Sequence, residues 1–95
     1  MVHYLLLKFN PGFFSDEIFS LAVHTYTELE SALPGIEKVQ IYKNCVCRNS
    51  NADLLVKMDL ASEAALSAYL KHPLHCGFIQ EVGSQVSQRI TFDRK

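Results

Sequence analysis

The sequence has no excess of charge of either sign, because nine basic and ten acidic residues give a formal net charge of −1. It also contains no run of five like charges. Proteins that bind nucleic acid or an anionic membrane carry a basic patch or stripe. The composition therefore argues against nucleic acid and membrane partners and favours a small neutral or apolar partner.

Cysteine is scarce and odd in number, with three residues in the chain. An odd count does not suit a disulfide framework and fits a reducing compartment. Cys45 and Cys47 lie two apart in a segment expected to be a strand, but a zinc site would need two further ligands. Cys76 lies apart, in an expected helix beside His75, where neighbouring side chains point in different directions. We therefore expect no metal site and no cysteine nucleophile.

Long hydrophobic runs are also missing. The chain begins MVHYLLLKFNPG, which has no basic leader and an apolar run too short for a signal peptide or a membrane span. No internal repeat, low-complexity segment or linker divides it. With 95 residues, the chain is predicted to form a single domain over 1–95 in the cytoplasm.

Four segments show the period-two alternation of β-strands, at 2–9, 36–47, 52–60 and 86–93. Helical patterns separate them, and the order β, α, β, β, α, β is that of the ferredoxin-like α+β fold, with a four-stranded antiparallel sheet. The first strand is apolar on both faces, and the last is expected to place Val86, Gln88, Ile90 and Phe92 on one side. The helices cover only one face of such a sheet. We therefore predict a homodimer in which the bare sheet faces pack together.

The helical segments have clear start and stop signals. Ser15 is a good N-cap, and apolar residues recur at helical spacing from there to Pro34. Ser62 begins a second helix, which is expected to end near Leu70. Pro73 suits the first position of a new helix, so the second helical segment is predicted to be broken.

The segment Tyr69-Leu70-Lys71-His72-Pro73-Leu74-His75 concentrates groups able to move protons. It places His72 at the helix junction and His75 in the first turn of the new helix. A neutral imidazole has an ordinary pKa of about 6.5, and the positive end of a helix disfavours protonation, so His75 is a candidate base. Tyr69 is its candidate partner. In the alternative interpretation, both imidazoles and the phenol only hydrogen-bond the backbone at the break.

An apolar cavity between helices and sheet would complete a small-molecule site around these groups. A histidine kept neutral by burial can take a proton from a carbon next to a carbonyl. Tyr26 can equally be a core residue, and the Asp93 carboxylate at the end of the last strand is expected to be solvated. We expect the substrate-binding residues to be His3, Tyr26, Leu5, Leu7, Val56, Met58 and His72.

Several motifs, spread in order along the chain, carry a resemblance to a known family: Val2-His3-Tyr4-Leu5-Leu6-Leu7-Lys8-Phe9, Leu33-Pro34-Gly35-Ile36, Asp53, the segment 69–75 with Phe78, and Phe92-Asp93. By these motifs the chain resembles the stress-responsive A/B barrel domain family over nearly its whole length. That resemblance implies a dimeric α+β barrel. In a plant branch of polyketide cyclases, which work without metal or organic cofactor, the positions matching His75 and Tyr69 are the base and its partner. The positions matching His3 and Tyr26 lie near the same pocket. This chain departs from that branch at Leu54, Val86 and Arg89.

Three functions follow as hypotheses. The first is a cofactor-free lyase, cyclase or isomerase that acts on a small apolar carbonyl compound. The second is a dimeric module that binds an apolar ligand without changing it. The third is a stress-related or assembly protein whose cavity is filled by its own side chains.

Overall fold

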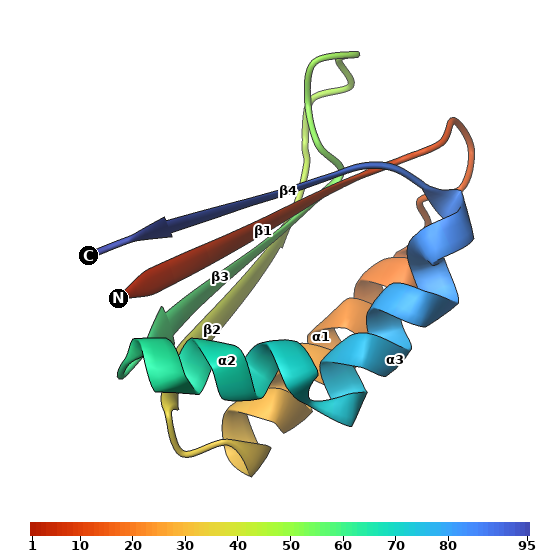
Figure 1. Cartoon of the computed structure of the whole chain (residues 1–95). Coiled ribbons are helices and arrows are strands. Elements are labelled where there is room, and N and C mark those ends of the chain that lie inside the picture. The colour runs from red at the N-terminus through yellow and green to blue at the C-terminus, as the bar shows by residue number, and fades with distance from the viewer.

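A computed structural model describes all residues 1–95 and confirms the ferredoxin-like order (Figure 1). The strands form one antiparallel sheet in the order β2-β3-β1-β4. No helix is both long and apolar enough to cross a membrane. The elements are β1 (Val2–Phe9), α1 (Asp16–Ala32), β2 (Ile36–Lys43), β3 (Leu54–Leu60), α2 (Glu63–Lys71), α3 (Pro73–Val82), a 3-10 turn (Gly83–Gln85) and β4 (Val86–Arg94).

The predicted helix boundaries have the expected caps. The Ser15 hydroxyl accepts a hydrogen bond from the backbone of Ile18 at 3.2 Å, and Ser62 does the same for α2. Pro73 occupies the start of α3, so the predicted break is present. His72 caps α3, because its Nδ1 accepts a hydrogen bond from the Leu74 amide at 3.1 Å.

All three helices pack on one face of the sheet, where the core lies (Figure 1). Alternate side chains of β1 point to this face and are buried, from His3 to Phe9. The register places Leu5 opposite Val56 and Leu7 opposite Leu54, so β3 contributes its own buried row. Full burial of an apolar side chain stabilises a fold by about 1.5–3 kcal/mol, so this double row contributes much of the folding energy.

Gly35 allows α2 to lie close to the turn between α1 and β2. A Cβ at this position would lie 2.5 Å from the Cβ of Ala65 on α2, closer than real side chains approach. The Gly35 carbonyl also accepts a hydrogen bond from the Ala61 amide at 2.9 Å. The turn thus fixes the start of α2 and, through it, the position of Tyr69 at its other end.

The opposite face of the sheet is covered by no element of the chain (Figure 1). The side chains of Tyr42, Ile90 and Phe92 are 48%, 55% and 60% exposed. Half-buried Tyr4 and Leu6 lie beside them on β1, and Leu55 lies on β3. We call these six residues the bare sheet face. The second apolar side that the sequence gives to β1 therefore lies here.

Two details differ from the sequence prediction. Val86 does not share a side with Ile90 and Phe92, because the register between β1 and β4 shifts at Phe9. Val86 lies opposite Phe9 and packs against the core, whereas Gln88 lies opposite Lys8. An extra residue in one strand turns the following side chains to the other face.

The second and third strands are also shorter than predicted. β2 ends at Lys43, so Cys45 and Cys47 lie in an exposed loop instead of a strand. In that loop, the Asn51 side-chain amide donates to the Asn44 side-chain oxygen at 3.2 Å and to the Val46 carbonyl at 3.1 Å. Asparagine side chains that bond locally in this way compete with the pairing of strands.

Candidate functional site

Four polar aromatic side chains from four different elements meet between the sheet and the helices. His3 lies on β1, Tyr26 on α1, Tyr69 on α2 and His75 on α3, and none is more than 3% exposed. The ring centroids of Tyr69 and His75 are 4.4 Å apart, and those of His3 and Tyr69 are 5.5 Å apart. We call these four residues the His75 cluster. The structure therefore brings together four of the predicted site residues.

Local sequence explains how the cluster forms. Because α3 begins at Pro73, His75 lies in its first turn and faces the interior. Phe78 lies three residues further on the same face, and its ring meets the Tyr26 ring at a centroid distance of 5.5 Å. Tyr26 belongs to the buried stripe of α1 with Ala22 and Leu29. Tyr26 is thus a core residue by packing and a member of the polar cluster by its hydroxyl.

His75 is held as a neutral imidazole. Its pKa is lowered from 6.5 to about 4, first by burial and then by the electrostatic influence of Arg89 and of His3. Its Nδ1 and the Tyr26 hydroxyl oxygen form a hydrogen bond of 3.0 Å. At neutral pH, His75 is therefore unprotonated and free to accept a proton.

The direction of this hydrogen bond decides which ring nitrogen can act. Burial raises the pKa of Tyr26 to about 12, and the Tyr69 hydroxyl and the Arg89 charge oppose the rise only in part. The Tyr26 hydroxyl therefore keeps its proton and can serve as donor or acceptor. When the proton of His75 lies on Nδ1 and is donated to Tyr26, the lone pair on Nε2 is free. That tautomer is the one competent for proton abstraction.

The Tyr69 hydroxyl is buried and makes no hydrogen bond of good geometry, although the Tyr26 hydroxyl lies near enough for each phenol to shift the pKa of the other. Burial is the main cause that raises its pKa, and the nearby Tyr26 adds to the rise, so the phenol stays protonated. A buried hydroxyl without a partner costs about 1–3 kcal/mol. Such groups are rare in folded proteins, and this one lies beside an imidazole. The arrangement leaves one hydrogen bond for a ligand atom to make.

His3 has a partner that the sequence analysis missed. Its Nδ1 lies 2.6 Å from the Asp93 carboxylate, although Asp93 was expected to be solvated. The Asp93 side chain is 40% exposed, so it links the buried imidazole to the surface. The register gives the reason, since Asp93 lies directly opposite His3 on β4. A prediction of strand register would have found this pair.

The other predicted site residues lie elsewhere. His72 is occupied as the cap of α3. Leu5, Val56 and Met58 are packed in the core with at most 1% exposure and line none of the four main pockets. The members of the His75 cluster line none of these pockets either. The apolar cavity expected beside the imidazole is therefore not open in this structure.

Leu7 alone among the predicted apolar lining residues reaches a pocket. This pocket has a volume of about 330 Å³ and lies between α3 and β4. Ile79, which lines this pocket, lies one helical turn beyond His75 on α3. We call it the Arg89 pocket; its lining residues are Leu7, Ile79, Val82, Gly83, Val86, Ser87, Gln88 and Arg89.

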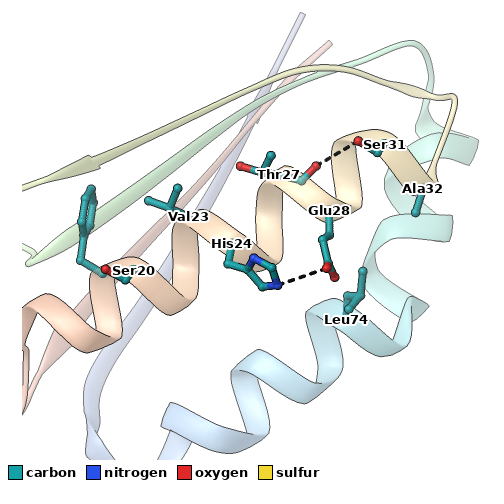
Figure 2. Close-up of a pocket in the computed structure, with 9 residues that line it drawn as sticks. Ser20, Val23, His24, Thr27, Glu28, Ser31, Ala32 and Leu74 are labelled. Atoms are coloured by element: carbon teal, nitrogen blue, oxygen red, sulfur yellow. Dashed lines mark hydrogen bonds and ion pairs between the residues drawn. The ribbon is translucent and has the colours of Figure 1, made fainter.

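The largest hollow is a surface groove of about 910 Å³ along α1, which Figure 2 shows. It is lined by Val23 and by the ion pair of His24 and Glu28, whose atoms are 3.1 Å apart, and Leu74 of α3 closes one side. The groove contains no member of the His75 cluster. No group of three metal-binding side chains lies close enough anywhere to hold a metal ion.

The lowered pKa of His75 predicts a loss of stability in acid. In the unfolded chain the imidazole binds a proton near pH 6.5, but in the folded chain only near pH 4. The stabilising contribution is therefore complete above pH 6.5 and is lost as the pH falls toward 4, by about 2–3 kcal/mol. Urea unfolding at fixed protein concentration should show that His75→Gln removes this part of the pH dependence.

The exposed His24 provides a matched control, because its side chain is 73% exposed. A His24→Gln variant should keep the acid sensitivity of the natural chain. If His75→Gln and the natural chain lost the same free energy of unfolding between pH 7 and 4, His75 would not be the group responsible.

Comparisons with known proteins agree with this fold. The model of the Stress Responsive A/B Barrel Domain matches residues 1–95. A dimeric ferredoxin-like protein of unknown function from Thermobifida fusca is 20% identical with a TM-score of 0.78, covering 96% of this chain and 85% of that one. A Dabb family protein from Mesorhizobium loti is 19% identical with a TM-score of 0.73, covering 99% and 93%.

A hydroxynitrile lyase from Passiflora edulis is also similar in structure, with 12% identity, a TM-score of 0.74, and coverage of 96% of this chain and 87% of that one. No curated protein matches the sequence significantly. At such identities, the structural likenesses establish the fold alone. The family model, by contrast, spans every residue and agrees with the sequence motifs and the sheet order. The chain belongs to the stress-responsive A/B barrel domain family.

Proposed function

We propose that this protein is a cofactor-free acid–base enzyme that acts on a small apolar carbonyl compound, with His75 as the base and Tyr69 as its partner. The observation that carries the proposal is the contact of a neutral buried imidazole with a buried phenol that lacks a hydrogen-bond partner. Either group alone would be an ordinary core residue. Together they provide an acceptor for a proton and a donor for an oxygen.

The proposed step is a proton transfer from carbon. Nε2 of His75 takes a proton from the carbon next to the carbonyl, and the C–H electron pair moves toward the carbonyl oxygen. Tyr69 donates a hydrogen bond to that oxygen as its negative charge grows, while its raised pKa keeps the proton on the phenol. Tyr26 holds the ring of His75 through Nδ1.

Magnitudes limit the choice of reaction. Positioned acid–base groups accelerate a reaction by about 10²–10⁴-fold, so the uncatalysed step must already be fairly easy. Because the pKa of His75 is about 4, it is also a weak base. A carbon between two carbonyl groups, as in a β-diketone, is acidic enough to suit it. Isomerisation, aldol closure and cleavage of the reverse aldol type all begin with, or pass through, such a carbanion.

The fold gives modest support of its own. A hydroxynitrile lyase has a similar fold, so the scaffold accommodates at least one lyase. Fold does not determine reaction, and the argument therefore stays with the residues of this chain. A substrate would have to displace side chains to reach the His75 cluster, and the nearest opening is the Arg89 pocket.

The proposal includes a homodimer formed through the bare sheet face. That face exposes Tyr42, Ile90 and Phe92 in a single chain, and no helix is left to cover it. A patch of this kind on a small domain marks an interaction surface. Two-fold pairing would bury the same patch on both subunits. A cytoplasmic location, predicted from the cysteine content, is also part of the proposal.

A second function is favoured by a different observation. The His75 cluster lines none of the four main pockets, which suits a protein whose interior is filled by its own side chains or which binds a ligand without changing it. In that case the Tyr69 hydroxyl would be a tolerated defect of the core. The two functions differ in one measurable result, the exchange of carbon-bound hydrogen.

Solvent deuterium exchange tests the proposal directly. A panel of β-diketones and simple ketones in deuterium oxide, followed by proton NMR with and without the protein, should show accelerated loss of the signal next to the carbonyl for at least one compound. The expected acceleration is about 10²-fold or more over buffer. Binding of panel members, seen as a thermal shift, without any acceleration would favour the non-catalytic function.

A further inference from the structure

Arg89 lies on the helix side of the sheet although it is a charged residue. The register places it directly opposite Leu7, one of the fully buried residues of β1. Residues that lie opposite one another in antiparallel strands point to the same face. Arg89 is exposed at the rim of the Arg89 pocket, so its charged group lies where an apolar hollow opens to solvent.

The Arg89 guanidinium has no partner within the chain. It forms no ion pair with a carboxylate, and its side chain makes no hydrogen bond. Asp93, which lies on the same face of β4, is already paired with His3. Glu81 on α3 is exposed and unpaired with Arg89. The five donors of the guanidinium therefore remain available.

The charge of Arg89 acts on the His75 cluster itself. It is among the influences that lower the pKa of His75 and oppose the raised pKa values of Tyr26 and Tyr69. A charge must lie nearby to have such an effect in a partly solvated site. Ile79, which lines the Arg89 pocket, lies one helical turn from His75 on α3, so a ligand held by Arg89 would reach the imidazole and the phenol once the side chains between them move.

The rest of the pocket is mainly apolar. Leu7, Ile79, Val82 and Val86 form its floor and walls, and Ser87 and Gln88 lie beside the arginine. Its volume of about 330 Å³ is at the lower end of the range for small-molecule sites, about 300–1,000 Å³. The pocket thus suits a compound with a short apolar body and one anionic end.

We infer that the substrate of the proposed reaction is a small oxo acid, whose carboxylate is bound by Arg89 while its carbonyl group reaches Tyr69 and His75. This inference rests on the proposed function for its reaction but on the Arg89 pocket for its binding. A guanidinium binds a carboxylate through two parallel hydrogen bonds, which fixes the orientation of the ligand as well as its position. Arg89 is therefore assigned as the residue that determines specificity for an acid.

The positive charge has a second effect on the reaction. An enolate carries negative charge that is absent from the starting ketone, and a cation close to the cluster stabilises it. The same cation would repel a substrate with a positive group. Both effects favour an anionic substrate that forms an enolate over a neutral one of equal size.

A matched pair of compounds tests the inference. Succinylacetone is a β-diketone that carries a carboxylate, and its methyl ester has the same body without the charge. Binding measured by ligand-observed NMR at low salt should be about 10-fold or more tighter for the acid than for the ester. Arg89→Leu should weaken binding of the acid by about 10–100-fold and leave the ester unchanged, because a hydrogen bond to a charged group contributes about 1.5–3 kcal/mol.

Arg48→Leu provides the control, because it removes the same charge from the exposed loop between β2 and β3. It should keep the preference for the acid, and Arg89→Lys should keep part of it. The inference is overturned if the natural chain binds acid and ester equally, if it binds neither, or if the preference survives in Arg89→Leu.

The outcomes also separate this inference from the proposed function. Selective binding of the acid without any deuterium exchange would refute the proposed enzymatic function and support Arg89 as a carboxylate-binding residue. If acid and ester bound with equal affinity and exchanged deuterium at equal rates, the proposed enzymatic function would be supported and the role of Arg89 in specificity would be refuted. Each result thus bears on one claim alone.

Discussion

Replacing Phe92 by glutamate is expected to convert the proposed homodimer into a monomer. Phe92 is the most exposed large apolar side chain, at 60%, and its ring lies against Tyr4 at a centroid distance of 6.2 Å. In a two-fold interface the substitution occurs on both subunits, so two carboxylates would be buried against an apolar sheet. Loss of an aromatic anchor costs about 2–4 kcal/mol, and the buried charges add to it.

The expected change is therefore a dissociation constant raised by about 10³-fold or more. Sedimentation velocity or light scattering at micromolar concentration would show a dimer for the natural chain and a monomer for Phe92→Glu. Circular dichroism should show that the monomer keeps its secondary structure, because Phe92 packs on no helix.

Phe13 provides a matched control. It is another exposed phenylalanine, at 49%, but it lies in the turn between β1 and α1. Phe13→Glu should leave the dimer intact. A natural chain that is monomeric at micromolar concentration, or a Phe92→Glu variant that stays dimeric, would show that the bare sheet face is not the interface.

The fold was predictable because its signals are local and repeated. Ser15 and Ser62 as caps and Pro73 as a helix start each act within one turn of their own position, so sequence alone places them. The two apolar faces of β1 likewise show in its alternation. What sequence could not give was the register shift that moves Val86 to the core side, because it depends on how β4 meets β1 across the sheet.

The candidate site was predictable in its membership but not in its contacts. His3, Tyr26, Tyr69 and His75 are polar aromatic residues placed on apolar faces, and the structure gathers all four. The hydrogen bond between Tyr26 and His75 joins residues 49 positions apart, and the pair of His3 and Asp93 joins residues 90 positions apart. Such pairs are fixed by tertiary packing, which local patterns do not contain.

The openness of the site was the least predictable feature. An apolar face predicts burial, but it does not tell whether the buried space holds a ligand or the side chains of the protein. Leu5, Val56 and Met58 fill that space here. The charged Arg89, in contrast, lies opposite a core leucine and lines the pocket that is open. The polar side of β4, which carries Ser87, Arg89, Thr91 and Asp93, was thus a better sign of the opening than the apolar residues themselves.

His75→Gln is expected to lower the rate of deuterium exchange into an accepted substrate by about 10²–10⁴-fold, the range for loss of a positioned base. Glutamine is polar and near in size, so the change removes the basic nitrogen with little change in packing. Affinity for the substrate should alter much less than the rate, because the base acts on the carbon and Arg89 is expected to hold the carboxylate. His24→Gln, on the outer surface of α1, should retain the full rate.

The pH profile gives a reading that a purely structural role would not produce. Because the pKa of His75 is about 4, the exchange rate of the natural chain should be level from about pH 5 to 8 and fall in more acidic solution. Tyr26→Phe removes the hydrogen bond on Nδ1, so it should lower the exchange rate and also shift the pH at which the rate falls in acid. A loss of packing alone would leave that pH unchanged. If His75→Gln catalysed exchange at the rate of the natural chain, with the same fall in acidic solution, another group would have to take the proton.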